Sequence, residues 1–393
     1  MSGPTTDPQG FNGQPSVPGT VSSPLCRSRL NYLTDYQATQ ATAGEPSQMV
    51  EVRQTSSMGK GLFATRHIPL GTRIQADLPL VRISNLHPFS RDVAVICNAL
   101  RYLSKAEFEE LDQLDYNEGY VTEDNCRKIR EWYKGQAFTT PSQFPLKGKA
   151  LREYAKITIK RCAIFIANRV ALGVTVQHGM GVFRLTSRVN HSCVPNTFKW
   201  YNWDLGQLTL HAMRDIQPGE ELTADYIRGT LITKQERAER LSNWDFTCTC
   251  PGCADPDLES TRRRAIWLSE RVNRFSTWRN GFVVDMGLPM PWGNAGARQE
   301  VGELILLLMG LGLEGWELIR AFQADALFHL DAYDHEMATH YAERAAELER
   351  IIIGDETELL YDLEEGAWAL VQHVKGVIKA RTDAQPMEWQ GEE

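Results

Sequence analysis

The chain has 393 residues and a formal net charge of −8, with 42% hydrophobic and 23% charged residues. This length accommodates two or three domains and a large core, and the composition is that of an ordinary globular protein. The acidic balance argues against direct binding of nucleic acid, because neutralising phosphates requires a basic surface. A basic peptide or protein segment is a better match for an acidic chain.

Residues 1–46 are predicted to form a disordered tail, because they are rich in small and polar residues and show no sustained hydrophobic periodicity. Residues 1–24 lack the apolar core of a secretory signal. The most apolar later run, residues 304–313, is too short to cross a bilayer. We therefore expect an intracellular protein without membrane attachment, in the cytoplasm, the nucleus or both. Its eight cysteines should be reduced thiols or metal ligands.

Short strands are predicted over residues 50–83, where apolar runs alternate with the turn formers glycine and proline. Residues 66–74 resemble residues 214–222. Each segment has an apolar residue, a turn with proline and glycine, and then a new strand. Coincidence between two ordinary turns is the alternative explanation.

Helices are predicted on both sides of a second set of short strands at residues 173–226. Ser104 and Glu107 have the spacing of a capping box, and residues 147–170 have helical spacing of apolar residues. After Cys253 we expect helices near residues 258–278, 298–330, 334–353 and 356–380. The last two resemble the helix hairpins of repeat proteins. The basic run that begins at Arg262 is predicted to be a solvated helix face rather than a nucleic-acid contact.

Three cysteines indicate a metal site. Cys248, Cys250 and Cys253 lie within six residues, beside a Pro-Gly turn that would let their sulfurs converge. Zinc prefers four tetrahedral thiolates, so a fourth ligand must come from elsewhere. Cys193 is the best donor because it lies in a loop-like region, whereas Cys97, Cys126 and Cys162 fall in helix-like stretches. Three unrelated reduced thiols are the alternative.

Two further patterns could suggest other chemistry. His191 and Cys193 would face the same side of an extended chain, but a Cys–His hydrolase normally takes its base from a distant part of the sequence. Gly59, Lys60 and Gly61 would allow a ligand to approach the backbone closely. This segment lacks the third glycine of a dinucleotide-binding fingerprint, so a nucleotide fold of that type is not expected.

Four motifs in order carry a resemblance to a known family. They are Met-Gly-Lys-Gly-Leu-Phe-Ala at residues 58–64, Asn-His-Ser-Cys-x-Pro-Asn at 190–196, Gly-Glu-Glu-Leu at 219–222 leading to Tyr226, and Cys-x-Cys-x-x-Cys at 248–253. Any one would be weak evidence, but together they resemble a SET-domain protein lysine methyltransferase. The resemblance covers about residues 48–255. It is strongest to the SET-and-MYND (SMYD) branch and to fungal SET proteins without the MYND finger.

The resemblance implies an α+β architecture. A β-rich SET fold would occupy residues 47–230, with a knot-like core formed by residues 190–196 and 220–226 and a helical insert at residues 86–170. Residues 231–256 would form a post-SET zinc segment, and residues 257–393 an α-helical domain that could be TPR-like. The insert holds only isolated cysteines, so the MYND finger is absent.

The resemblance also assigns the sites. The structural zinc would be bound by Cys193, Cys248, Cys250 and Cys253. S-adenosylmethionine would be bound by Gly59, Lys60, Gly61, Asn168, Asn190, His191, Tyr226 and Phe246. The substrate channel would be walled by Tyr226, Trp244 and Phe246, with Trp244 at a position where relatives often carry a second tyrosine.

Tyr226 corresponds to the catalytic tyrosine of the family. A lysine ammonium has a pKa of about 10.4 and is not nucleophilic, so the site must desolvate it and let its proton leave. Transfer of the methyl group then depends mainly on positioning. The substrate would be a lysine of a histone or of another protein. The alternative function is a catalytically inactive SET module that serves as a zinc-stabilised interaction scaffold.

Overall fold

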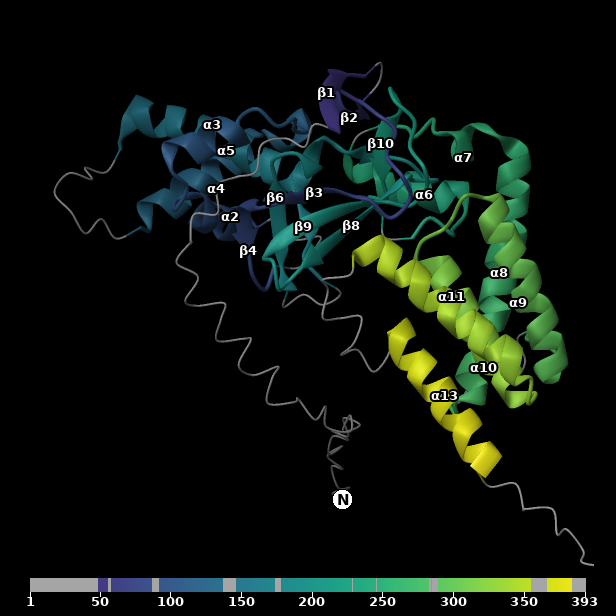
Figure 1. The fold of residues 1–393 in the computed structure, drawn as a ribbon. Coiled ribbons are helices and arrows are strands. Elements are labelled where there is room, and N and C mark those ends of the chain that lie inside the picture. The colour runs from purple at the N-terminus through teal and green to yellow at the C-terminus, as the bar shows by residue number, and fades with distance from the viewer. Residues whose placement is uncertain are drawn as a thin grey trace, which may run out of the picture. The chain divides into compact units, whose positions relative to one another are not determined.

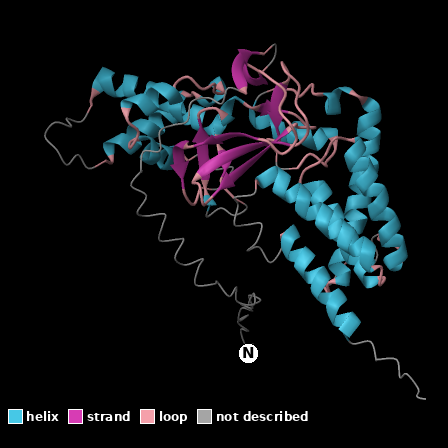
Figure 2. Cartoon of the chain, in the orientation of Figure 1, coloured by secondary structure: helices cyan, strands magenta, loops and turns pink. Residues whose placement is uncertain are grey.

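The computed structural model describes residues 49–55, 58–86, 92–136, 146–173, 178–227, 229–244, 246–282, 284, 289–354 and 366–383. The predicted disordered tail at residues 1–46 lies outside these residues. Within the described part, short strands are followed by long helices toward the C-terminus (Figures 1 and 2). The predicted combination of a β-rich region, a helical insert and C-terminal helices is confirmed.

The central sheet joins segments that are far apart in the sequence. Its strands, in spatial order, are β1 (Val50–Gln54), β2 (Lys60–Ala64), β10 (Glu221–Ala224) and β7 (Asn190–His191). β7 runs parallel to β10, whereas β2 pairs antiparallel with both β1 and β10. The two segments predicted to form the knot-like core therefore lie side by side, and both carry motif residues.

Asn196 connects the segments at residues 190–196 and 220–226 by side-chain hydrogen bonds. Its amide nitrogen donates to the carboxylate of Glu220 at 3.0 Å and to the carbonyl of Glu221 at 2.9 Å. Its amide oxygen accepts from the N–H of Thr223 at 2.8 Å. A buried amide whose donors and acceptor are all used fixes its neighbours strongly, since an unsatisfied buried polar group is costly.

Two smaller sheets complete the β-rich region. One has the order β3 (Arg73–Asp77), β9 (Gln207–Ala212) and β8 (Thr197–Asn202), and the other β4 (Pro79–Ile83), β6 (Met180–Phe183) and β5 (Val170–Ala171). All pairings in these sheets are antiparallel.

The two similar turns in the sequence pair with each other. Ile68 and Ile216 form an antiparallel bridge in which each N–H donates to the other's carbonyl at 2.9 Å. Gly71 and Gly219 follow with φ of +77° and +81°, a conformation that favours glycine. The similar segments at residues 66–74 and 214–222 therefore form two turns of similar conformation that lie side by side.

The helical insert packs around its own core. Its helices are α2 (Val93–Leu100), α3 (Lys105–Leu111), α4 (Glu123–Lys134) and α5 (Gly148–Asn168), with a 3-10 turn at Glu118–Tyr120. The capping box is present: Ser104 accepts from the N–H of Glu107, whose carboxylate accepts from the N–H of Ser104. Buried residues of α5 recur every three or four positions, so one face of this helix closes the core.

The C-terminal part of the chain is helical. Its helices are α6 (Lys234–Leu241), α7 (Pro251–Ala254), α8 (Pro256–Arg279), α9 (Gly293–Gly310), α10 (Trp316–Asp331), α11 (His335–Ile353) and α13 (Ala367–Asp383), with a 3-10 turn at Ser242–Trp244. The prediction of one continuous helix near residues 298–330 is wrong, because α9 ends at Gly310 and α10 begins at Trp316. Gly312, with φ of +66°, turns the chain after α9, and the N–H of Leu313 donates back to the carbonyl of Leu308.

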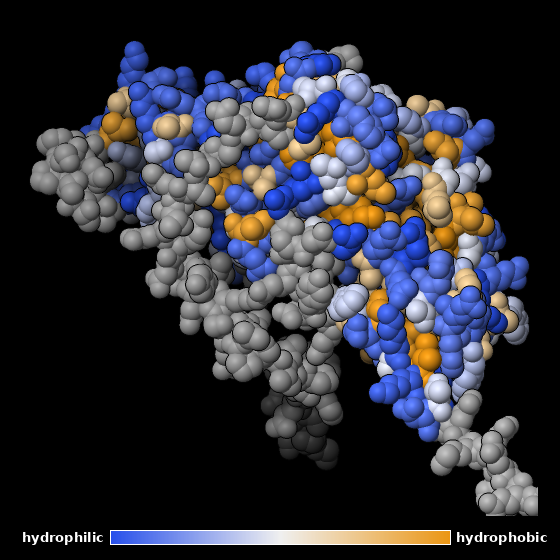
Figure 3. Space-filling model, in the orientation of Figure 1, coloured by the Kyte–Doolittle hydropathy of each residue, from blue (hydrophilic) through white to orange (hydrophobic). Residues whose placement is uncertain are grey.

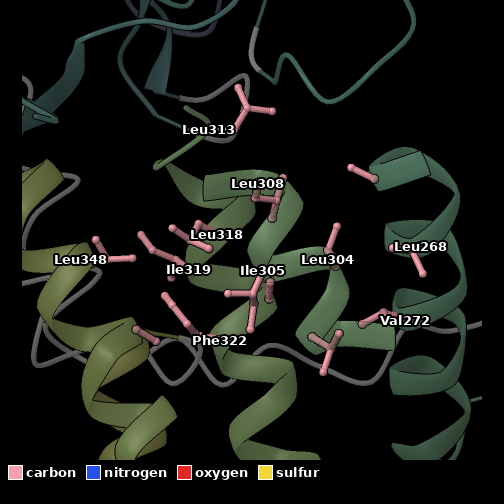
Figure 4. Packing of buried hydrophobic residues seen from close by; sticks show 14 of the residues in the cluster. Leu268, Val272, Leu304, Ile305, Leu308, Leu313, Leu318, Ile319, Phe322 and Leu348 are labelled. Carbon is pink, nitrogen blue, oxygen red and sulfur yellow. The ribbon is translucent and has the colours of Figure 1, made fainter. Parts of the chain in front are cut away.

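Leucine, isoleucine and phenylalanine side chains from α8, α9, α10 and α11 meet in one hydrophobic cluster (Figure 4). The cluster reaches the β-rich region through β8. Trp316, at the start of α10, packs against Phe198 and Trp200, with ring centroids 6.0 Å apart in both pairs. α11 also packs on β8 and β9. The sheet that carries β8 and the C-terminal helices therefore share a core.

The prediction of a solvated basic face on α8 is wrong for its first member. Arg262 has no exposed surface, because it shares the buried side of α8 with Ala265 and Leu268, three and six residues later. Its neighbours Arg263 and Arg264 are exposed, as predicted. A run of three adjacent arginines must point in different directions around a helix.

The visible face of the molecule is largely hydrophilic, with hydrophobic patches between the blue areas (Figure 3). Among the described residues, no helix is long and apolar enough to span a membrane.

Replacing Trp316 by alanine should destabilise the chain by about 2–3 kcal/mol, because it removes the aromatic contact between α10 and β8. The free energy of unfolding from chemical denaturation measures this. Trp292→Ala is the matched control, since Trp292 is 92% exposed and should leave stability unchanged. Equal effects of the two substitutions would contradict the shared core.

Candidate functional site

Asn190 and His191 form the short strand β7, and both are buried. The amide nitrogen of Asn190 donates to the Glu221 carboxylate at 2.8 Å and to the carbonyl of Lys60 at 3.4 Å. These bonds join three of the four motifs, because Lys60 belongs to the first motif and Glu221 to the third.

The glycine segment passes directly over Asn190. A Cβ atom added at Gly61 would lie 2.5 Å from the Glu221 carboxylate and 3.1 Å from the Asn190 amide nitrogen, so no larger residue fits there. Gly59 has φ of +67°, which favours glycine. The residue between them, Lys60, has an exposed side chain, and its carbonyl accepts from Asn190.

Asn168, at the end of α5, lies near the same turn. Its amide nitrogen donates to the carbonyls of Asp115 at 2.7 Å and Ile164 at 2.9 Å. The Asp115 carboxylate is 3.4 Å from where a Cβ on Gly59 would lie, and it accepts from Arg188 at 3.1 Å. Asp115 therefore connects two predicted cofactor residues. Sequence reasoning missed it, because no motif surrounds it.

Tyr226 follows β10 and stands beside His191. Its hydroxyl donates to the carbonyl of Val189 at 2.8 Å, and its backbone N–H donates to Nδ1 of His191 at 3.2 Å. Burial raises the pKa of Tyr226, so its phenol keeps its proton at neutral pH. A protonated phenol that already donates its hydrogen can still accept one through its oxygen.

Aromatic rings surround Tyr226. Its ring centroid is 5.4 Å from that of His191 and 5.3 Å from that of Trp244, and Phe246 lies 6.2 Å from His191. The indole N–H of Trp244 donates to the carbonyl of Ala167 at 2.9 Å, next to Asn168. Trp244 therefore presents an apolar ring to Tyr226, and its single polar group holds the ring in place.

The four cysteines converge as predicted. The sulfurs of Cys193, Cys248, Cys250 and Cys253 all lie within 4.8 Å of one another. Cys193 Sγ is 3.4 Å from Cys253 Sγ and 3.9 Å from Cys248 Sγ. Zinc–sulfur bonds of about 2.3 Å in a tetrahedron require sulfurs about 3.8 Å apart, so this cluster could hold a zinc ion. The seven cysteines among the described residues are all free thiols.

Two fully buried arginines lie beside the cysteine cluster. The Arg237 guanidinium is 3.7 Å from Cys253 Sγ and pairs with the Glu259 carboxylate at 2.8 Å. The Arg262 guanidinium donates to the carbonyls of Cys193 at 3.4 Å and Thr230 at 2.6 Å. Four thiolates carry more charge than one zinc ion neutralises, so these cations offset the excess. Sequence reasoning missed the burial of both, although Ala265, three residues after Arg262, could have indicated it for that residue.

His191 connects the cysteine cluster to Tyr226. Its Nε2 is 3.3 Å from Cys193 Sγ, and its Nδ1 accepts from the N–H of Tyr226. Burial lowers the pKa of His191 to about 4, so the ring is neutral and Nε2 carries the hydrogen that points to sulfur. Both ring nitrogens are used within the protein. A ligand could therefore reach His191 only through its ring face or its backbone.

Replacing Cys250 by serine should abolish metal binding, because a structural zinc site needs all four ligands. Metal analysis of the purified protein should give about one zinc per chain, and close to none for the variant. Cys126→Ser is the matched control, since this buried cysteine lies in the insert and outside the cluster. Wild-type protein with free thiols and no metal would contradict a zinc site.

The SET domain family matches residues 59–227 of this chain. The histone-lysine N-methyltransferase set5 of Schizosaccharomyces pombe is 28% identical over 208 residues, which cover 53% of this chain and 51% of the relative. Human histone-lysine N-methyltransferase SMYD3 is 30% identical over 154 residues, covering 37% of this chain and 34% of the relative.

The chain thus spans about half the length of the first relative and about a third of the second. The motif residues in β2, β7 and β10 fall inside the matched region, as do Tyr226 and Cys193, whereas the cysteine motif at residues 248–253 lies outside it. The family match and the convergence of the motifs agree: residues 59–227 of this chain are similar to the SET domain.

Proposed function

We propose that this chain is an S-adenosylmethionine-dependent protein-lysine N-methyltransferase. One observation carries the proposal: Tyr226 lies against His191, while Asn190 on the same strand holds the glycine turn. A buried phenol near a turn that is rich in glycine is what a site needs if it must orient an amine next to a bound cofactor. The names of the relatives, which are lysine methyltransferases, support the same activity.

The residues that would hold the cofactor are the backbone of Gly59, Lys60 and Gly61, together with Asn168 and Asn190. When bound, S-adenosylmethionine supplies a methyl group on a positively charged sulfur. Close contact of a ligand with a backbone turn favours glycine, and a Cβ at Gly61 would collide with Glu221 and displace the turn. Phe246 would close over the cofactor from the post-SET side.

Tyr226, Trp244 and Phe246 would form the acceptor channel. The aromatic walls disfavour the charged form of a lysine amine, because burial penalises ammonium. The Tyr226 oxygen, whose hydrogen is already donated to Val189, would accept a hydrogen bond from the amine and so set its direction. The acceptor would be a lysine of a histone or another protein.

The zinc site would be structural. Four cysteines leave no open coordination position, so the metal has no place for substrate or water. Its role would be to fix the chain around Cys248, two residues after Phe246, against β7. A catalytically inactive scaffold is the second candidate, and the absence of a second channel hydroxyl at Trp244 favours it. A scaffold, however, would have no need for Tyr226 at this position.

Replacing Tyr226 by phenylalanine should reduce methyl transfer about 100-fold or more, because the amine loses the oxygen that orients it. Transfer is measured with radiolabelled S-adenosylmethionine on arrays of lysine peptides and on core histones. Cofactor binding, measured by calorimetry, should persist in the variant. Tyr102→Phe, at a residue that is 81% exposed, is the control and should behave as wild type.

Three outcomes separate the candidates. Wild-type protein that binds cofactor and methylates no lysine would favour the scaffold. Wild-type protein that binds no cofactor would contradict the proposed function entirely. Transfer that is unaffected by Tyr226→Phe would reject the catalytic role of this residue alone.

Replacing Gly61 by alanine should weaken cofactor binding by roughly tenfold or more, because the added Cβ would collide with the carboxylate of Glu221 and crowd Asn190. Calorimetric titration with S-adenosylmethionine measures the loss. Gly302→Ala on α9 is the matched control, since its Cβ would meet open space. Unchanged affinity in the Gly61 variant would show that the turn does not contact the cofactor.

A further inference from the structure

Lys199 lies on the middle of β8 and points toward Tyr226. Side chains alternate along a strand, and Phe198 and Trp200 face Trp316 of α10. Lys199 therefore projects from the other face of the sheet. Its Nζ lies 4.8 Å from the centroid of the Tyr226 ring, in a cation–π contact. No motif includes this residue, and nothing in the proposed mechanism uses it.

The ammonium of Lys199 is poorly compensated. In the described part of the chain, Nζ makes neither a hydrogen bond nor an ion pair. The nearest anion that attracts it is Asp225, whose two carboxylate oxygens accept from the N–H groups of Ile227 at 2.7 Å and Gly229 at 2.5 Å. An ammonium held against a phenol ring without an anionic partner is costly. Such an arrangement is expected where a charge has a function.

The charged and titratable groups around Lys199 are few. His191 faces it from β7, Asp225 and Tyr226 from the end of β10, and Glu317 of α10 lies behind Asp225. Burial lowers the pKa of Lys199 to about 8, against the attraction of Asp225. At neutral pH the side chain is therefore mostly a cation, and it becomes neutral above pH 8.

We propose that Lys199 determines which form of the acceptor enters the channel: its ammonium excludes the charged form of the target lysine from the face of Tyr226 and admits the neutral amine. This inference rests on the proposed methyltransferase function. It assigns Lys199 as a specificity-determining residue, distinct from the residues that would touch cofactor.

The physical reason is repulsion between two like charges in a site with little water. Two ammonium groups about 5 Å apart, at an effective dielectric constant of about 20, lower the pKa of the second amine by roughly 2. Lysines next to another cation are activated in this way as nucleophiles.

The proton balance is simple. The target ammonium is desolvated by the aromatic walls as well as repelled by Lys199, so it releases its proton to water on entering, while Lys199, which Asp225 attracts, keeps its own. The nitrogen lone pair then forms the new N–C bond as the bond between carbon and the positive sulfur breaks, and that bonding pair stays on sulfur. The product is a methylated ammonium, which Lys199 again repels, so the same charge that admits the neutral amine favours release of the product.

Replacing Lys199 by methionine tests this with a readout that a packing role would not move. Turnover is measured against pH with the lysine peptide that gives the strongest signal on the array. In the Met variant, KM should fall, because the channel now tolerates the ammonium. At pH 7, kcat should fall about tenfold or more. In the profile of kcat against pH, the rise should shift to higher pH by roughly 1–2 units. Lys199→Arg, which keeps a positive charge, should retain the pH dependence of kcat that the wild-type protein shows.

Each outcome decides the inference. The inference is overturned if the Met variant has the same kcat as the wild-type protein and the same dependence of kcat on pH. Faster turnover of the Met variant at every pH also overturns it, because Lys199 would then merely block the channel. An Arg variant that behaves like the Met variant shows that charge is not the cause. Calorimetric binding of S-adenosylmethionine by each variant verifies that it is folded.

Wild-type protein provides an independent measurement. If Lys199 acts as proposed, wild-type kcat should already level off near pH 8, well below the ordinary lysine pKa of about 10.4. A limb that is still rising at pH 10 contradicts the inference even if no variant folds. Wild-type protein that transfers no methyl group at any pH overturns the proposed function itself. Methyl transfer whose kcat still rises at pH 10 overturns only the role of Lys199.

Discussion

The contact of His191 with both Cys193 and Tyr226 is the constraint on which the site depends. One neutral ring accepts a hydrogen bond from the backbone at Tyr226 and directs its own N–H to a sulfur of the cysteine cluster. The position of the phenol is therefore tied to the position of the thiolates. The sequence suggested that Asn190 and His191 serve one task and Cys193 another, but the structure joins the two tasks through a single buried imidazole.

Electrostatics differ on the two sides of this ring. On the cysteine side, two buried arginines balance an excess of negative charge. On the tyrosine side, Lys199 brings a positive charge without a bonded partner into an aromatic environment. The first arrangement lowers the cost of burying charge and stabilises the structure. The second leaves that cost in place, which is typical of functional sites.

Much of the fold could be predicted because its signals are local. Turn glycines, the capping box and cysteine spacing are read directly from neighbouring residues, and the order of the motifs identified the SET domain. The direction of a side chain from a strand or helix depends on which face the rest of the protein covers. Lys199 and Asp115 were therefore not assigned, and Arg262 was wrongly placed on a solvated face, since each contacts a partner at least 27 positions away. The break at Gly312 was missed because apolar spacing continues through it.

Strand β8 presents opposite faces to two different parts of the molecule. Phe198 and Trp200 hold α10 on one face, while Lys199 between them lies over the ring of Tyr226 on the other. These three side chains share one stretch of backbone, so a displacement of the C-terminal helices cannot move the first face without moving the second. The C-terminal helices are therefore mechanically linked to the surroundings of Tyr226 through the backbone of β8.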